Sequence, residues 1–96
     1  MFTIILNNTT FTADNYYRTM SFVEDHFQGS ININAIKSNN TTADIEALAP
    51  TKITSITLKK ENEVVYTLTD INASIQSYDE SFGGDRININ LNISCD

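Results

Sequence analysis

His26 is the only histidine in the chain, and histidine is the residue type that most often serves in general acid–base catalysis. Catalysis by a general acid or base, or by a triad, needs a nucleophile and an orienting carboxylate close to that imidazole. The neighbouring Glu24 and Asp25 are acids of the same short stretch and do not provide such an arrangement. We interpret His26 as a surface or turn residue, and we predict no catalytic residue and no enzymatic activity.

A second polar cluster surrounds the glycine pair Gly83-Gly84. Asp79, Glu80 and Asp85 carry carboxylate oxygens of the kind that calcium prefers, but their spacing does not match an EF-hand loop with its closing glutamate. The pair also lacks the further glycines and the lysine of a phosphate-binding loop. We expect a solvated hairpin turn here, and we predict no metal-binding residue, no cofactor-binding residue and no cofactor.

Cys95 is the only cysteine. A single thiol cannot form a disulfide within the chain, and it cannot build a zinc site from thiolates. A zinc site based on the one histidine would have to recruit further ligands from scattered acids. We therefore interpret Cys95 as a spectator thiol.

The charge balance argues against a nucleic-acid partner. Twelve acidic residues stand against six basic ones, which gives a net charge of −6. The basic residues are scattered along the chain: Arg18, Lys37, Lys52, Lys59, Lys60 and Arg86. An excess of acids repels a phosphate backbone, so we expect no direct binding to nucleic acid.

The longest apolar run is Ile4-Ile5-Leu6, which is far too short to span a membrane. The first residues also lack the basic stretch, the long apolar segment and the cleavage site of a secretory signal. We expect no membrane partner, and a product that stays inside the cell or leaves it by lysis.

Length and composition indicate one folded domain over residues 1–96. Hydrophobic residues make up 41% of the chain and charged residues 19%, a balance that is typical of a folded chain and not of a disordered one. Thirteen Ile and twelve Thr favour strands, because β-branched side chains pack well on a pleated sheet.

Alternation of apolar and polar residues locates the strands. In residues 87–93 the apolar residues Ile87, Ile89, Leu91 and Ile93 alternate with three asparagines. This pattern predicts a half-buried strand with the apolar row facing the core and the asparagine row facing solvent or a partner. Shorter alternation predicts strands within residues 2–6, 31–34 and 64–68.

Turn residues separate these strands. Asn7-Asn8, Asn39-Asn40 and residues 60–63 and 79–85 have the composition of turns that join antiparallel strands. They predict three hairpins: residues 2–6 with those after Asn8, residues 54–58 with 64–68, and residues 71–78 with 87–93.

One segment predicts a helix, and a second segment is ambiguous between strand and helix. Residues 41–50 have Thr suited to an N-cap, acids in the first turn and a closing Pro50, and they predict a helix of about two turns. Residues 16–27 fit either a strand or a helix, and the mediocre helix formers among them favour a strand. The elements together predict a mainly β fold, a small antiparallel sandwich or barrel of about 6–8 strands with one short helix near residues 41–49.

Six aromatic side chains are candidates for the core or for binding a partner: Tyr16, Tyr17, Phe22, Phe27, Tyr66 and Tyr78. For each of them core packing is the favoured interpretation. The strand edges carry few of the Lys and Pro residues that discourage pairing with another chain, so we expect an assembled protein.

Residues 54–69, followed by residues 75–80 and the final alternating strand, resemble small structural proteins of tailed-bacteriophage virions, and residues 2–11 have the same style. The resemblance extends over the chain in its strands and turns. It implies a capsid-, neck- or tail-associated β domain without catalytic residues, made in the host cytoplasm and located in the virion.

We therefore expect a non-enzymatic structural or accessory virion protein that acts through protein–protein assembly with other virion proteins or with copies of itself. The alternative is a small acidic phage-encoded inhibitor of a host nucleic-acid-binding or defence protein. Small size, acidity and the free cysteine are the basis of that alternative.

Overall fold

Seven strands and one short helix make up the computed structural model, which describes residues 1–38, 40–80 and 83–95. In chain order they are β1 (Phe2–Leu6), β2 (Thr9–Val23), β3 (His26–Ile36), α1 (Thr41–Leu48), β4 (Ile56–Lys60), β5 (Glu63–Leu68), β6 (Asn72–Glu80) and β7 (Arg86–Cys95). The 15 residues of β2 alone exceed the 8 of the helix. The prediction of a mainly β fold with one short helix is confirmed.

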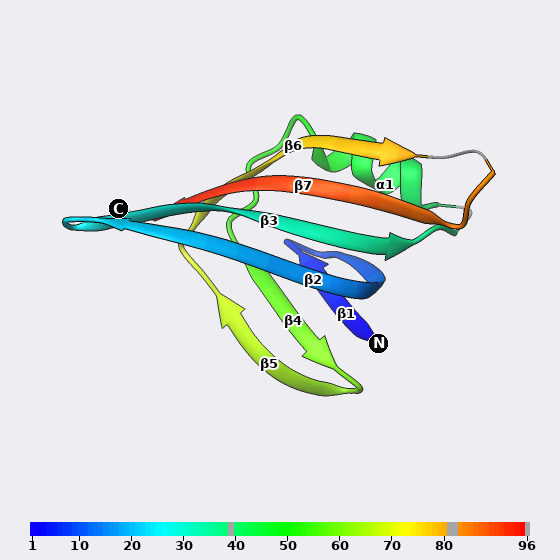
Figure 1. Ribbon diagram of the computed structural model, residues 1–96, viewed down its shortest axis with the longest axis horizontal. Helices are drawn as coiled ribbons and strands as arrows, with labels where there is room; N and C mark the ends of the chain where they lie inside the picture. The colour runs from blue at the N-terminus through cyan, green and yellow to red at the C-terminus, as the bar shows by residue number, and fades with distance from the viewer. Residues whose placement is uncertain (39, 81–82, 96) are drawn as a thin grey trace.

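All strands belong to one antiparallel sheet with the order β5-β4-β1-β2-β3-β7-β6. The long strand β2 takes part in both halves of it. Its first residues pair with β1, and after a bulge between Ala13 and Asn15 its pairing among the described residues is with β3. Because a bulge bends a strand, the half containing β1, β4 and β5 crosses beneath the half containing β3, β7 and β6 (Figure 1).

The curled sheet almost closes on itself. Ile53, just before β4, forms an isolated antiparallel bridge with Ala73 of β6, with N–H to O distances of 2.8 and 3.0 Å in the two directions. This bridge and the strands from β4 round to β6 form a ring. β5 lies outside the ring and, among the described residues, pairs only with β4. Of the two predicted architectures, the single sheet corresponds to an incompletely closed barrel.

The core fills the space between the two halves of the sheet. It consists of inward-facing aliphatic side chains with one phenylalanine: Ile4, Leu6, Phe11, Ala13, Ile31, Ile33, Ala35, Ile45, Leu48, Ile53, Ile56, Leu58, Ile71, Ala73, Ile87, Ile89, Leu91 and Ile93. The last strand contributes its whole apolar row, while Asn88 and Asn92 are exposed and Asn90 is half-buried. The predicted orientation of this strand is therefore confirmed.

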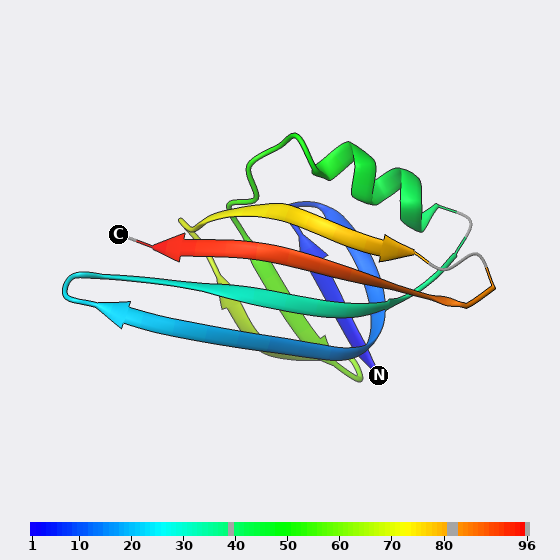
Figure 2. The ribbon, with the colours of Figure 1, turned by 45° about the horizontal axis from the view of Figure 1, so that its top comes forward.

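Helix α1 lies alongside β6 and covers the open side of the sheet there (Figure 2). Ile45 and Leu48 are buried, and Thr42 donates a hydrogen bond to Glu80 of β6 at 2.9 Å. The N-cap residue is Asn40, without a capping hydrogen bond from its side chain. The composition of Asn39-Asn40 predicts a turn between two strands, but Asn40 instead begins the helix. Asn39 lies outside the described residues.

The three predicted hairpins are confirmed. Asn7 has a φ of 55°, and Glu61 and Asn62 have φ values of 50° and 75°, which is the left-handed geometry of tight hairpin turns. Residues 16–27 form the end of β2, a turn at Glu24-Asp25 and the start of β3, so the strand interpretation is correct. No helix among the described residues is long and apolar enough to cross a membrane.

Candidate interaction surfaces

The outward face of β2, β3, β7 and β6 is a continuous array of polar side chains, which we call the polar face. The strand register aligns its residues in four rows that cross the four strands. The rows are Ser21, Gln28, Ser94, Asn72; Thr19, Ser30, Asn92, Ser74; Tyr17, Asn32, Asn90, Ser77; and Asn15, Asn34, Asn88, Asp79. Bulges at Asp14 and Gln76 keep the rows in step, because each absorbs one extra residue in its strand.

The chemistry of the polar face is almost uniform. Its side chains are hydroxyls and carboxamides, with Asp79 as the one charge and Tyr17 as the one aromatic ring in the four rows. Tyr17 is 64% exposed. In its row, Asn32 Nδ2 donates to Asn90 Oδ1 at 2.7 Å, and Asn90 Nδ2 donates to Ser77 Oγ at 3.3 Å. These bonds fix the two amides side by side.

A hollow of about 550 Å³ lies over the two rows next to Tyr17. It is lined by the polar residues of those rows together with Gly29 and Ile93. Among the residues that the structure describes, no charged side chain lines it. The hollow therefore offers neutral donors and acceptors only.

We call the β2–β3 hairpin the arm. A second surface lies at its free end. Its tip is at the far left in Figure 1, at the opposite end from the turn between β6 and β7. The rings of Phe22 and Phe27 face each other across the hairpin with centroids 6.0 Å apart. Phe22 is 79% exposed, and Val23 beside it is also exposed. Core packing, which the sequence favoured for each aromatic, is wrong for Phe22 and Tyr17.

β5 covers the part of the arm that lies closer to the core, on the face opposite the polar face. Tyr66 of β5 donates a hydrogen bond to the hydroxyl of Tyr16 of β2, and the two rings meet edge to face at 6.0 Å. The guanidinium of Arg18 lies 4.8 Å from the centre of the Tyr66 ring. Burial and the Tyr66 hydrogen bond raise the pKa of Tyr16 well above its ordinary value. Phe22 lies farther toward the tip than this cluster, and it is exposed.

The β4–β5 hairpin carries a third, smaller surface. Val64 and Val65 are 58% and 55% exposed on β5, the edge strand of the sheet. Their neighbours Glu61 and Glu63 are exposed as well. An edge strand with exposed apolar side chains is a site where another strand can pair.

The residues weighed for catalysis or metal binding lie apart. His26 is exposed at the start of β3, at the tip of the arm. Asp79, Glu80 and Asp85 lie at the opposite end, around a turn of which residues 81 and 82 are outside the described residues. Cys95 pairs through its backbone with Phe27, and its side chain is outside the described residues.

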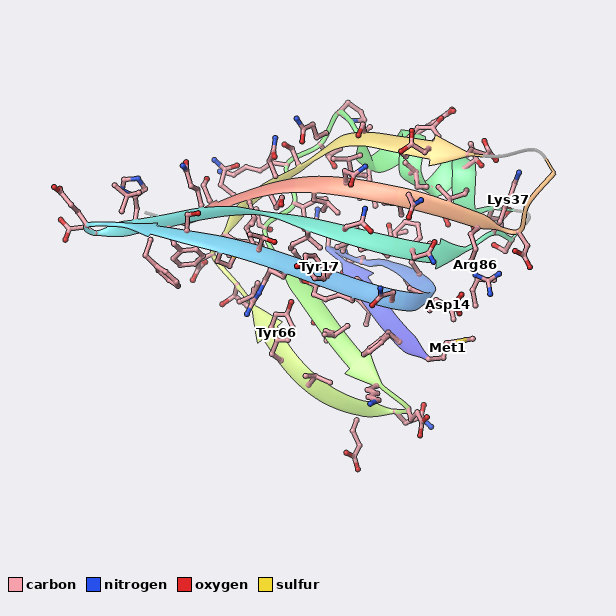
Figure 3. All side chains as sticks on the ribbon, viewed as in Figure 1. Met1, Asp14, Tyr17, Lys37, Tyr66 and Arg86 are labelled. Atoms are coloured by element: carbon pink, nitrogen blue, oxygen red, sulfur yellow. The ribbon has the colours of Figure 1, made fainter. Side chains whose placement is uncertain are left out.

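Two of these acids, Glu80 and Asp85, are paired with cations. Glu80 Oε2 lies 2.7 Å from Lys37 Nζ, and this ion pair with the Thr42 hydrogen bond lowers the pKa of Glu80. Arg86 pairs with Asp14 and, at 2.9 Å, with Asp85. Asp14, Lys37 and Arg86 gather at this end of the sheet (Figure 3). Within residues 1–38, 40–80 and 83–95, no group of three potential metal ligands comes together.

Sequence reasoning did not find the polar face as a site. The asparagine row of β7 was visible in the alternation, but its neighbours Ser74, Ser30 and Thr19 come from strands far apart in sequence. The signal for them was only that polar residues alternate with apolar ones in each strand.

Comparisons with known protein families, curated proteins and solved structures find no match to this chain.

Proposed function

We propose that this protein is a non-enzymatic structural or accessory component of a tailed-phage particle, and that it assembles through its arm with copies of itself or with other particle proteins. The observation that carries the proposal is the exposed Phe22 at the tip of the arm. The phage setting rests on the resemblance of the strands and turns to small virion proteins.

An exposed phenylalanine at the end of a projecting hairpin is unfavourable for an isolated molecule. Burial of one such side chain contributes about 1.5–3 kcal/mol, and Phe22 in the monomer leaves most of this unrealised. Val23 and the half-buried Phe27 extend the apolar tip. An exposed apolar group of this kind at the end of a hairpin is typical of a protein–protein contact.

The arm also has a free strand edge. Residues 15–23 of β2 pair with β3 on one side and, in the part of the chain that the structure describes, with no strand on the other. A free edge next to an apolar tip supports docking by strand addition, in which backbone hydrogen bonds and side-chain burial act together.

A second copy of the chain offers a complementary surface. The tip of the arm and the β4–β5 hairpin lie at different ends of the molecule (Figure 1), and the latter exposes Val64 and Val65 on the edge strand β5. A contact between two different surfaces of identical chains is heterologous, and repetition of it gives a ring or an extended array. Such geometry suits a protein that lines or decorates a particle.

The test measures assembly with and without the apolar tip. Wild-type protein should sediment as an oligomer at high concentration, and mass spectrometry should find it in purified particles. Phe22→Ser should shift the sedimentation to the monomer. Tyr17→Ser, which removes an exposed aromatic from the polar face, is the matched control and should leave the oligomer intact.

A wild-type chain that remains monomeric at high concentration and is absent from particles contradicts the proposal. Capture of a host nucleic-acid-binding or defence protein by that monomer would then favour the inhibitor alternative.

A further inference from the structure

We propose that the polar face binds an uncharged carbohydrate chain, with the hollow over β2, β3, β7 and β6 as its central subsite and Tyr17 as a stacking platform at its rim. This inference does not depend on the proposed assembly, because it concerns the outward face of the sheet and leaves the tip of the arm free.

The electrostatics of the hollow favour a neutral ligand. The chain carries a net charge of −6, yet no charged side chain within residues 1–38, 40–80 and 83–95 lines the hollow, and Asp79 stands in the row farthest from it. An anionic polymer would meet no cation there, and a basic peptide would meet no acid. A neutral ligand is the class that loses no ion pairing or hydration of charge on binding.

The hydrogen-bonding groups of the polar face match those of a sugar. Sugar hydroxyls both donate and accept, and carboxamides and hydroxyls are the side chains that do the same without charge. In the row formed by Thr19, Ser30, Asn92 and Ser74, no hydrogen bond joins one side chain to another. The donors and acceptors of this row are therefore turned to solvent and available to a ligand.

The polar face is also preorganised, and its polar groups are regularly spaced. The bonds from Asn32 to Asn90 and from Asn90 to Ser77 hold the adjacent row in one arrangement, so that ordering it costs a ligand less. Neighbouring strands lie about 4.8 Å apart, which places polar groups at intervals comparable with the width of a sugar ring.

The aromatic ring of Tyr17 lies next to the polar groups of the hollow. Tyr17 lies on the same face as Thr19, two residues along β2, and it pairs with Asn32 of the next strand. An exposed ring beside polar groups offers an apolar plane for the C–H face of a sugar, together with a hydroxyl for hydrogen bonding. Tyr17 is therefore expected to supply contact area that the small side chains of the hollow lack.

The experiment is an NMR titration of the ¹⁵N-labelled full-length protein. The probes are maltohexaose, cellohexaose and chitohexaose as neutral chains and polygalacturonate as an anionic one. At least one neutral probe should shift the side-chain amide signals of Asn32, Asn90 and Asn92, and polygalacturonate should not. Tyr17→Ala should weaken binding about tenfold, and Asn92→Ala about three- to tenfold.

Two controls separate this site from the rest of the molecule. Thr19→Ala should weaken binding, whereas Thr67→Ala, which removes an exposed hydroxyl from β5, should not. Phe22→Ser should abolish assembly and leave carbohydrate binding unchanged, so the two proposals fail independently.

Three results overturn the carbohydrate assignment. One is the absence of shifts on the polar face with every neutral probe at its solubility limit. Another is binding that Tyr17→Ala and Asn92→Ala leave unchanged. The third is a set of shifts on this face that follow protein concentration without any sugar, which would make it an interface between copies of the chain.

Discussion

Gly29 determines how closely the two strands of the arm approach each other. A Cβ atom at this position would lie 2.0 Å from the carbonyl oxygen of Thr19 and 2.7 Å from Sδ of Met20. The methionine side chain can move, but the oxygen belongs to the backbone of the paired strand. Any side chain at residue 29 therefore has to push β2 away from β3.

Gly29→Ala should destabilise the fold by about 1–3 kcal/mol, the usual cost of forcing extra atoms into a packed site. Urea denaturation measures the change, and Ser30→Ala on the exposed side of the same strand is the control, with an expected effect within about 0.5 kcal/mol. If Gly29→Ala is as stable as the wild type and leaves the amide spectrum of β2 unchanged, the arm adapts freely and the argument from close approach is wrong.

At the scale of the elements, the turn between β1 and β2 holds a third segment in place. Asn7 Oδ1 accepts hydrogen bonds from the backbone N–H groups of Thr54 at 2.9 Å and Ser55 at 3.4 Å, and Asn7 Nδ2 donates to the carbonyl of Lys52 at 3.1 Å. The backbone of Asn7 has a φ of 55°. One residue thus combines the left-handed turn with the anchoring of the chain that enters β4.

Two substitutions of Asn7 separate these roles. Asn7→Gly keeps the positive φ and removes the side-chain bonds, so we expect a loss of about 1–2 kcal/mol in the free energy of unfolding. Asn7→Ala adds the cost of a left-handed non-glycine residue, about another 1 kcal/mol. Thermal and urea unfolding should rank wild type, Asn7→Gly and Asn7→Ala in that order.

The exposed neighbour Asn8→Ala is the control for these variants and should be close to neutral. Equal stabilities of Asn7→Gly and Asn7→Ala would show that the backbone conformation contributes nothing, and that only the side-chain bonds matter.

The elements themselves were largely predictable, because they depend on local patterns. Ile87, Ile89, Leu91 and Ile93 alternate with asparagine, and alternation fixes both the strand and its buried face. The bulges at Asp14 and Gln76 were not predicted, since one extra residue in a strand leaves no strong local signal.

The candidate surfaces were harder to predict for a related reason. Tyr16 and Phe22 point to the same side of β2, yet Tyr16 packs against the core and Phe22 does not. The difference depends on where β5 ends beneath the arm, which is a long-range relation that no pattern within residues 9–23 contains. The rows of the polar face are likewise defined by pairing between distant strands.

At the scale of the whole molecule, the bridge between Ile53 and Ala73 joins the two halves of the curled sheet. Both residues are buried, and their backbones exchange two hydrogen bonds. A further bond runs from the N–H of Ile71 to the carbonyl of Thr54 at 3.3 Å. The core lies inside the ring that these contacts complete, so opening the bridge exposes apolar side chains from both halves.

Native-state hydrogen exchange should therefore show that the ring opens only when the molecule unfolds. The amide protons of Ile53 and Ala73 should exchange with the same free energy, and the same dependence on urea, as that of Leu91 in the interior strand β7. The amides of β5, which lies outside the ring, should include protons that exchange with lower free energy by local opening. If Ile53 and Ala73 instead exchange by a local opening that is insensitive to urea, the two halves separate without loss of the core. Stability would then come from each half packing on its own side of β2, because the bridge would contribute nothing to the cooperativity of unfolding.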